Sequence, residues 1–352
     1  MMGSMKKWIS VLVSMFVVCI MIQSPVYASV TAESTSASEA LFTEQGHYVF
    51  QPKVCSSFMK EVFGETMCET WGHLVDAVLA GENTFACPDQ HTYDWVMGQF
   101  PKHCLPILPE LIDYAYDRSH SVKNGIANFT WLVAPEEAAA RIAEFGKQVE
   151  GILNAALRDD DTDFEKAAAL YDYFYRHYLY DWEMYQESRE RYVETTPMHL
   201  FHTGMGICSE IAPAYSYLLV QAGVEATTMM GPGHEWSYVR IGGHEYHIDP
   251  TFVLESEESL EFFMMTDEQR AVSGFTREQM TITSNYSGDH PHPNYTADNN
   301  TYSVLWDYRF DELIRDESKL RCWKYTAGWE KDSFDFDYSE YDNTMSKPPE
   351  GT

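Results

Sequence analysis

Three residues in the second half of the chain have the side chains needed for thiol-based acyl transfer. Cys208 can supply a nucleophilic thiolate, His234 a general base and acid, and Asp249 a carboxylate that orients the imidazole. They occur in this order, 26 and 15 residues apart. Such chemistry needs an ionised thiol, an imidazole within reach and a third group that fixes the tautomer of the ring. The sequence therefore predicts a Cys-His-Asp triad.

Cys208 stands between a glycine-rich turn and an apolar helix, in "GMGICSEIAPAYSYLLVQAG" (204–223). Gly204 and Gly206 allow a sharp turn and the close approach of a substrate. The first residue of a helix lies at the positive end of the helix dipole, which stabilises a thiolate, and its N–H is free to donate to an oxyanion. The alternative is a core cysteine that happens to begin a helix.

A predicted hairpin brings the other two residues together. "HEWSYVRI" (234–241), a Gly-Gly turn and "HEYHIDPTF" (244–252) are typical of two antiparallel strands joined by a two-residue turn. This register places Asp249 opposite Trp236 and makes it the diagonal neighbour of His234 on one face. Diagonal Cα atoms are about 7–8 Å apart, which these two side chains can bridge. A turn one residue longer would separate them.

The remaining pattern predicts helices before Cys208 and strands after it. Thr162 and Glu165 form a capping-box pattern at the start of one helix. The expected elements are helices at 73–81 (ended by Gly81), 105–118 (with Pro109 in its first turn) and 135–157, and a strand at 224–230. The expected organisation is a signal peptide (1–28), a linker (29–43), a mainly helical cysteine-containing region (44–158), a core (159–256) and a C-terminal extension with an acidic aromatic tail (257–352).

The first residues have the pattern of an export signal. Lys6 and Lys7 precede a short apolar run from Trp8 to Ile22, and small residues follow up to Ala28. This pattern predicts secretion with cleavage after Ala28, the alternative being an uncleaved membrane anchor.

Export would place the mature chain in an oxidising compartment, where disulfides form. The clustered cysteines predict one or two disulfides, with the pairing left open; they are Cys55, Cys68, Cys87 and Cys104. Cys208 and Cys322 lie apart from this cluster.

The chain is strongly acidic, with 24 Lys and Arg against 54 Asp and Glu and a formal net charge of −30. This charge disfavours binding to nucleic acid and to anionic lipid. We therefore expect no nucleic-acid partner and no membrane association once the signal is removed.

Three short motifs resemble the transglutaminase-like superfamily, which is related to papain-type cysteine proteases: "GIC" (206–208), "HEW" (234–236) and "DPT" (249–251). The resemblance covers about residues 160 to 256 and includes the upstream helix "EKAAALYDYFYRHYLYD". It implies an α+β fold in which the cysteine-bearing helix packs on an antiparallel sheet. The pattern of the remaining sequence predicts a mainly helical N-terminal extension and an irregular C-terminal extension.

The resemblance also implies residue roles: Cys208 as nucleophile, His234 as base and then acid, and Asp249 as the orienting residue. Family members use an upstream side chain as a second oxyanion donor, and Tyr180 is the candidate here. Two residues depart from the family pattern and bear on substrate access, since Glu235 replaces a usually small residue and Pro213 lies early in the cysteine helix.

Several functions share such a site. Hydrolysis of protein or peptide amides is expected first, because water is always available as acceptor; cross-linking by a transglutaminase and deglycosylation by an amidase are alternatives. A non-catalytic binding module with the same fold is the rival outside enzymes. Histidines that could suggest a metal lack zinc spacing and no calcium-loop motif is present, so neither metal nor cofactor is expected; they are His244, His247, His290 and His292.

Overall fold

The computed structural model describes residues 47–115, 121–191, 193, 195–282 and 295–341. The predicted signal peptide and linker, together with His290 and His292, lie outside the described residues. None of the helices in the described ranges is long and apolar enough to cross a membrane.

The N-terminal region combines helices with a small sheet in which β4 is paired by β1, β2 and β3, all antiparallel. Its elements are α1 (Ser57–Phe63), α2 (Glu65–Ala80), β1 (Thr84–Ala86), α3 (Gln90–Gly98), α4 (Phe100–Cys104), η1 (Leu108–Glu110), β2 (Ile112–Tyr114), β3 (Val122–Lys123), β4 (Ile126–Trp131) and α5 (Pro135–Ala156). Gly81 ends α2, as predicted, and adopts the left-handed conformation with φ of 74°.

The helix predicted at 105–118 is wrong. A short 3₁₀ turn, η1, is followed by strand β2, in which Ile112 pairs with Trp131 and Tyr114 with Phe129. The local apolar spacing suggested a helix, but pairing with β4 requires an extended chain here. Tertiary pairing overrides local propensity in such short segments.

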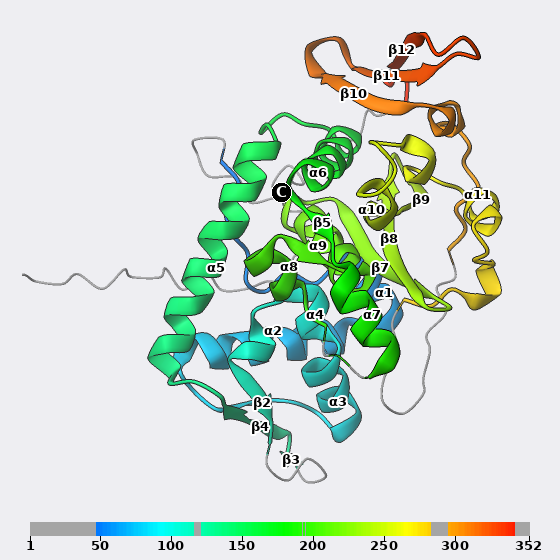
Figure 1. Cartoon of the computed structure of the whole chain (residues 1–352). Helices are drawn as coiled ribbons and strands as arrows, with labels where there is room; N and C mark the ends of the chain where they lie inside the picture. The colour runs from blue at the N-terminus through cyan, green and yellow to red at the C-terminus, as the bar shows by residue number, and fades with distance from the viewer. Residues whose placement is uncertain (1–46, 116–120, 192, 194, 283–294, 342–352) are drawn as a thin grey trace, which may run out of the picture. The chain divides into compact units, whose positions relative to one another are not determined.

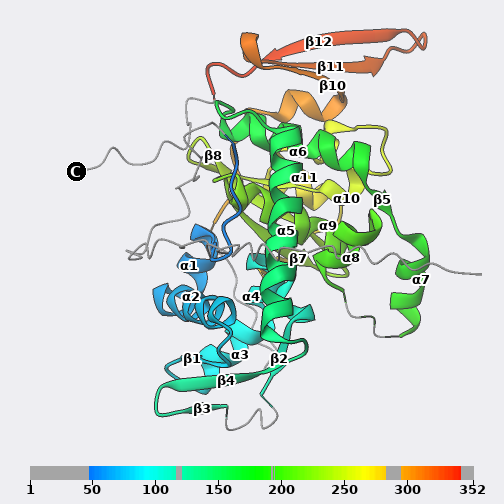
Figure 2. The ribbon, with the colours of Figure 1, turned by 90° about the vertical axis from the view of Figure 1, so that its left-hand side faces the viewer.

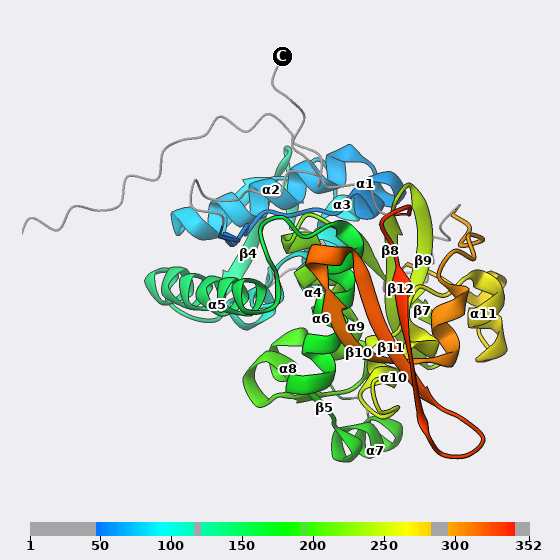
Figure 3. The ribbon, with the colours of Figure 1, turned by 90° about the horizontal axis from the view of Figure 1, so that it is seen from above.

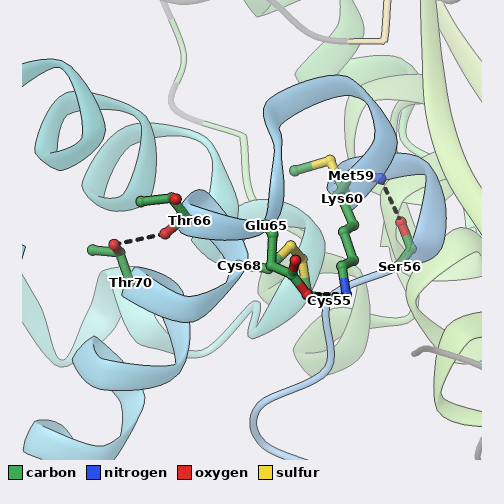
Figure 4. The surroundings of a disulfide bond; sticks show 8 residues. All are labelled: Cys55, Ser56, Met59, Lys60, Glu65, Thr66, Cys68 and Thr70. Carbon is green, nitrogen blue, oxygen red and sulfur yellow. Dashed lines mark hydrogen bonds and ion pairs between the residues drawn. A yellow bond between two sulfur atoms is a disulfide. The ribbon is translucent and has the colours of Figure 1, made fainter. Parts of the chain in front are cut away.

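A disulfide joins the start of α1 to α2 through Cys55 and Cys68 (Figure 4). Close to it, Lys60 forms an ion pair of 2.7 Å with Glu65 across the junction between the two helices. The other two clustered cysteines, Cys87 and Cys104, are buried free thiols. Of the one or two disulfides expected in the cluster, the structure has one, which joins Cys55 to Cys68.

The central region holds the antiparallel sheet β7–β8–β9 with α9 packed against it (Figure 1). Its elements are α6 (Asp163–His177), β5 (Leu179–Tyr180), α7 (Trp182–Glu190), α8 (Pro197–Thr203), β6 (Met205–Gly206), α9 (Cys208–Gln221), β7 (Glu225–Gly231), β8 (His234–Ile241), β9 (His244–Ile248) and α10 (Pro250–Val253). The capping box of Thr162 and Glu165 at the start of α6 is confirmed.

Helix α9 is the buried centre of this region. Every residue from Glu210 to Gln221 is buried, and the helix continues through Pro213 without interruption. The Ser216 hydroxyl donates to Ser237 Oγ on β8, 2.8 Å away, and Ser237 Oγ donates to a carbonyl of α9. These contacts fix the distance and rotation of the helix on the sheet.

The C-terminal region, which was expected to be irregular, ends in a further antiparallel sheet, in the order β10–β11–β12, so the aromatic tail is an edge strand (Figure 2). Its elements are η3 (Leu260–Phe262), α11 (Asp267–Val272), η4 (Arg277–Gln279), η5 (Ser303–Asp307), β10 (Arg309–Ile314), η6 (Arg315–Glu317), β11 (Lys319–Tyr325) and β12 (Lys331–Asp337). After β12, the Tyr338 hydroxyl donates to Glu165 Oε1, 2.5 Å away, and so ties this region to α6.

Candidate active site

Cys208 is the first residue of α9 and is partly exposed. As the first helical residue, its N–H has no acceptor within the helix. Gly204 ends α8 with φ of 75°, which glycine adopts without strain. A Cβ at Gly206 would lie 3.1 Å from Glu210 Oε2, so a larger residue would crowd the turn that leads into Cys208.

The buried side chain of Glu210 caps the N-terminus of the helix that begins at Cys208. Its buried carboxylate accepts from the backbone N–H of Ile207 at 3.3 Å and from His199 Nδ1 at 3.1 Å. Burial raises the pKa of Glu210, although the bonds from His199 and Ile207 oppose the rise. The side chain fixes the backbone just before Cys208 and, with it, the direction of the thiol.

The hairpin has the predicted register, with Ser237 paired to Ile248 and Ile241 to His244. The second strand is shorter than predicted, because Asp249 leaves it to cap helix α10. Asp249 Oδ1 accepts the N–H groups of Thr251 and Phe252, at 3.1 and 3.3 Å. The carboxylate is thus held rigidly at the end of β9.

The other oxygen of Asp249 binds His234, and Nε2 to Oδ2 measures 2.7 Å. This leaves Nδ1 as the ring nitrogen for the Cys208 sulfur. Burial disfavours the charged ring, but the charge and hydrogen bond of Asp249, together with Cys208, outweigh it and raise the pKa of His234 to about 9. Burial also opposes the charge of Asp249, and His234 and Arg270 overcome it, so that the pKa of the carboxyl is lowered.

Arg270 is the residue of this cluster that motif reasoning missed. Its side chain is fully buried, and Nη1 lies 3.0 Å from Asp249 Oδ2, the same oxygen that binds His234. The guanidinium stacks on Trp236 and Phe275, 4.2 and 4.4 Å from the ring centroids. These contacts offset part of the cost of burying a cation.

The His234 ring is held from its faces by aromatic side chains. Phe252 stacks on it at 4.8 Å between centroids with an interplanar angle of 14°, and Trp236 and Phe275 lie at 5.9 and 5.5 Å. The ring therefore has little freedom to turn away from Asp249.

His247, one of the histidines considered for a metal, has another set of partners. Its Nδ1 accepts from Trp236 Nε1 at 2.9 Å, and its Nε2 donates to Asp267 Oδ1 at 2.9 Å. Burial lowers the pKa of His247. Both ring nitrogens are thus occupied by protein groups, and within the described ranges no three His, Cys, Asp or Glu side chains gather as a metal site.

Tyr180, the predicted oxyanion donor, lies on the strand that pairs with the turn before Cys208. Strand β5 pairs in parallel with β6, so that Tyr180 lies opposite Gly206, two residues before Cys208. Burial, followed by the charge of Cys208, raises the pKa of the Tyr180 hydroxyl, which therefore stays protonated and able to donate.

Glu235 does not point at the site. Because β8 alternates, its side chain lies on the sheet face opposite His234, where Lys102 of α4 binds it at 2.9 Å. The Glu235 side chain therefore contacts the N-terminal region through Lys102 and does not face His234.

Comparison with known proteins finds a family that resembles the central part of the chain. Residues 151–257 match the family model of the transglutaminase-like superfamily, which starts eight residues before the expected core (159–256) and ends one residue after it.

 The expected core, residues 159–256, lies inside this range. The fold is α+β, with the cysteine helix on an antiparallel sheet, and this part of the chain is a transglutaminase-like domain.

One similar solved structure is described as a crystal structure of a TGase. It is 21% identical, with a TM-score of 0.27, and the match covers 38% of this chain and 35% of that chain. The chain thus spans about a third of the length of that structure. No curated protein matches the chain.

Proposed function

We propose that this protein is a secreted thiol enzyme that transfers the acyl group of a protein or peptide amide from Cys208 to water. The observation that carries the proposal is the position of His234. Its Nε2 binds the buried Asp249 carboxylate at 2.7 Å, and its pKa is raised through Asp249 and Cys208 against the effect of burial. A binding module does not need a charged imidazole between a thiol and a carboxylate.

The geometry supports a two-step reaction. The Cys208 thiolate attacks the amide carbon and forms a C–S bond, while the carbonyl oxygen becomes an oxyanion. The N–H of Cys208 and the Tyr180 hydroxyl are the proposed donors to that oxyanion. His234 gives its proton to the leaving nitrogen as the C–N bond breaks, which leaves a thioester.

Water then resolves the thioester. His234, now neutral, takes a proton from the water as its oxygen attacks the thioester carbon. The C–S bond then breaks and the acid product is released. The Cys208 thiolate remains on the enzyme and is paired again with the His234 imidazolium. Asp249 keeps the ring orientation in both steps, since its other oxygen is fixed by the cap of α10.

The test of the pair measures alkylation of Cys208 by iodoacetamide against pH, with mass spectrometry of each cysteine peptide. We expect Cys208 at pH 6 to react at least tenfold faster than a cysteine in an unstructured peptide, because the charged imidazole stabilises the thiolate. His234→Gln should remove this advantage at pH 6. The two proteins should converge as the pH rises through about 9, where His234 loses its charge.

Turnover is measured with fluorescently labelled casein, and Cys208→Ala should abolish release of labelled peptides. The buried thiols Cys87, Cys104 and Cys322 are internal controls that should remain unmodified. A Cys208 no faster than the peptide thiol, or turnover retained by Cys208→Ala, would refute the proposal. Incorporation of a labelled amine in place of hydrolysis would assign the cross-linking alternative.

A further inference from the structure

Large apolar side chains are exposed on the strand pair that leads into Cys208 and on the helix that follows β5. Leu179 on β5 is 63% exposed, Trp182 at the start of α7 is 54% exposed and Met205 on β6 is 37% exposed. Tyr185, one turn further along α7, is half-buried. We call these four residues the apolar rim.

The backbone connects the rim to the nucleophile. The parallel pairing of β5 with β6 sets Leu179 opposite Met205 and Tyr180 opposite Gly206. The N–H of Asp181 donates to the Gly206 carbonyl at 2.9 Å, so the start of α7 is tied to the turn that leads into Cys208. The rim and the thiol are therefore parts of one local structure.

The aromatic rings of the rim form a group with Tyr180. The Tyr180 and Trp182 centroids lie 4.8 Å apart in an edge-to-face arrangement, and Trp182 and Tyr185 lie 5.7 Å apart. Such pairs hold each ring in place, so the exposed surface is ordered.

Folding does not account for this surface. Helix α7, visible beyond β5 in Figure 3, has no buried residue, although Asp181 caps it through the N–H of Met184 at 2.8 Å. A helix in a folded protein normally gains its stability by burying an apolar face. An exposed group of large apolar side chains next to a reactive residue is typical of a binding surface.

The charged side chains of α7 indicate which kind of molecule the apolar rim binds. Its sequence "WEMYQESRE" has three glutamates and one arginine, Arg189, which donates to the Tyr185 hydroxyl at 3.0 Å. Arg191, which follows the helix, forms an ion pair with Glu187, so the acidic charge of α7 rests mainly on Glu183 and Glu190. The apolar rim is thus bordered by acidic side chains in a chain whose formal net charge is −30. Such a border favours cationic groups on the bound molecule.

We propose that the apolar rim binds the acyl donor, and that this donor is a peptide segment with an aromatic or large aliphatic side chain next to the attacked amide and Lys or Arg further along. The proposal rests on the function proposed above, because it takes Cys208 as the reacting group. It adds the substrate class, which the Cys-His-Asp arrangement leaves open.

The test measures binding separately from turnover. The Cys208→Ala protein is titrated against fluorescein-labelled decapeptides that share a glutamine and two lysines and differ at one position, Phe or Ala, beside the glutamine. We expect the Phe peptide to bind at least tenfold more tightly than the Ala peptide. Replacing the two lysines with glutamates should weaken binding of the Phe peptide by a similar factor.

Trp182→Ala, added to Cys208→Ala, should abolish the preference for Phe. The matched control is Trp329→Ala, because Trp329 is 81% exposed, contacts Tyr325 and follows β11, far along the chain from the site. That variant should keep the preference. Both side chains are exposed, so circular dichroism and thermal melting should show intact folds.

Equal binding of the two peptides, or a preference that survives Trp182→Ala, would overturn the proposal. Dimerisation lost in Trp182→Ala, or Trp182-dependent pelleting with phosphatidylcholine vesicles, would assign the rim to a second copy or to lipid and also overturn it. A reactive Cys208 without peptide preference refutes only this inference. A peptide preference with an unreactive Cys208 refutes the proposed function and leaves the rim as a peptide-binding surface.

Discussion

Asp249 is shared by two cations, and this sharing sets the charge balance of the candidate site. Oδ2 lies 2.7 Å from His234 Nε2 and 3.0 Å from Arg270 Nη1, and all three side chains are largely or fully buried. With a Cys208 thiolate the four charges cancel. Without Arg270, the Asp249 carboxylate would have His234 as its counter-ion among these residues, and the site would carry an uncompensated negative charge.

Arg270→Met tests this role. We expect the free energy of unfolding to fall by about 3–5 kcal/mol, since a buried pair loses one member. We also expect the pKa of His234 to rise, because Asp249 then has His234 as its counter-ion and the nearby Arg270 cation is gone. The faster alkylation of Cys208, relative to a protein that also carries His234→Gln, should therefore persist to higher pH. Urea unfolding and the iodoacetamide profile measure the two effects.

Arg277→Met is the matched control, because Arg277 pairs with Asp267 at 3.0 Å but is 37% exposed. It should cost at most about 1 kcal/mol and leave the pH profile unchanged. Equal effects of the two substitutions would show that Arg270 has no special relation to Asp249.

At the scale of elements, the N-terminus of α9 holds Cys208 in a fixed position. The turn before it is crowded around Gly206, and the Glu210 carboxylate binds the backbone of Ile207. The helix behind it is buried along its whole length and bonded to β8 through Ser216 and Ser237. Cys208 is thus the partly exposed end of a rigid element.

Glu210→Ala should loosen that end. The Ile207 N–H and His199 would each lose an acceptor in a buried setting, so we expect a loss of about 1–3 kcal/mol in stability. Slower alkylation of Cys208 should accompany it, because the thiol is less well aimed. Glu210→Gln, which keeps an acceptor oxygen, should retain most of both properties; if it behaves like Glu210→Ala, the charge rather than the hydrogen bonds holds the turn.

Local rules predicted the elements that carry Cys208, His234 and Asp249. The Gly-Gly turn determines the hairpin register, and the Thr162 capping box depends on neighbours three residues apart, so both can be read from sequence. Arg270 could not be predicted, because it reaches Asp249 from a separate short helix and "DEQRAV" has no distinguishing pattern. Strand β2 was missed for the same reason, since its partner β4 lies further along the chain.

At the scale of the molecule, the regions outside the transglutaminase-like domain are bonded to it at defined points. From the N-terminal side, Lys102 binds Glu235 next to His234. From the C-terminal side, Arg315 binds Asp161 at 2.6 Å and Tyr338 binds Glu165 at 2.5 Å, both at the start of α6. These two contacts connect the C-terminal region to the start of α6, inside the transglutaminase-like domain.

Tyr338→Phe measures this link. The substitution removes the hydroxyl that donates a hydrogen bond to the buried Glu165 carboxylate. We therefore expect a loss of about 1–3 kcal/mol in the free energy of unfolding. Tyr341→Phe is the control, since Tyr341 is 46% exposed, and it should change stability by less than about 0.5 kcal/mol. Equal stability of the two variants in urea would mean that the C-terminal sheet does not support α6.

The distribution of sulfur in the chain has a practical consequence. In the described ranges, Cys55 and Cys68 are joined, Cys87, Cys104 and Cys322 are buried, and Cys208 is partly exposed. A methanethiosulfonate spin label should therefore attach at Cys208 in the folded protein, with the other five cysteines of the described ranges left in place. The mobility of that label, followed by electron paramagnetic resonance, would report directly whether a ligand occupies the neighbouring surface.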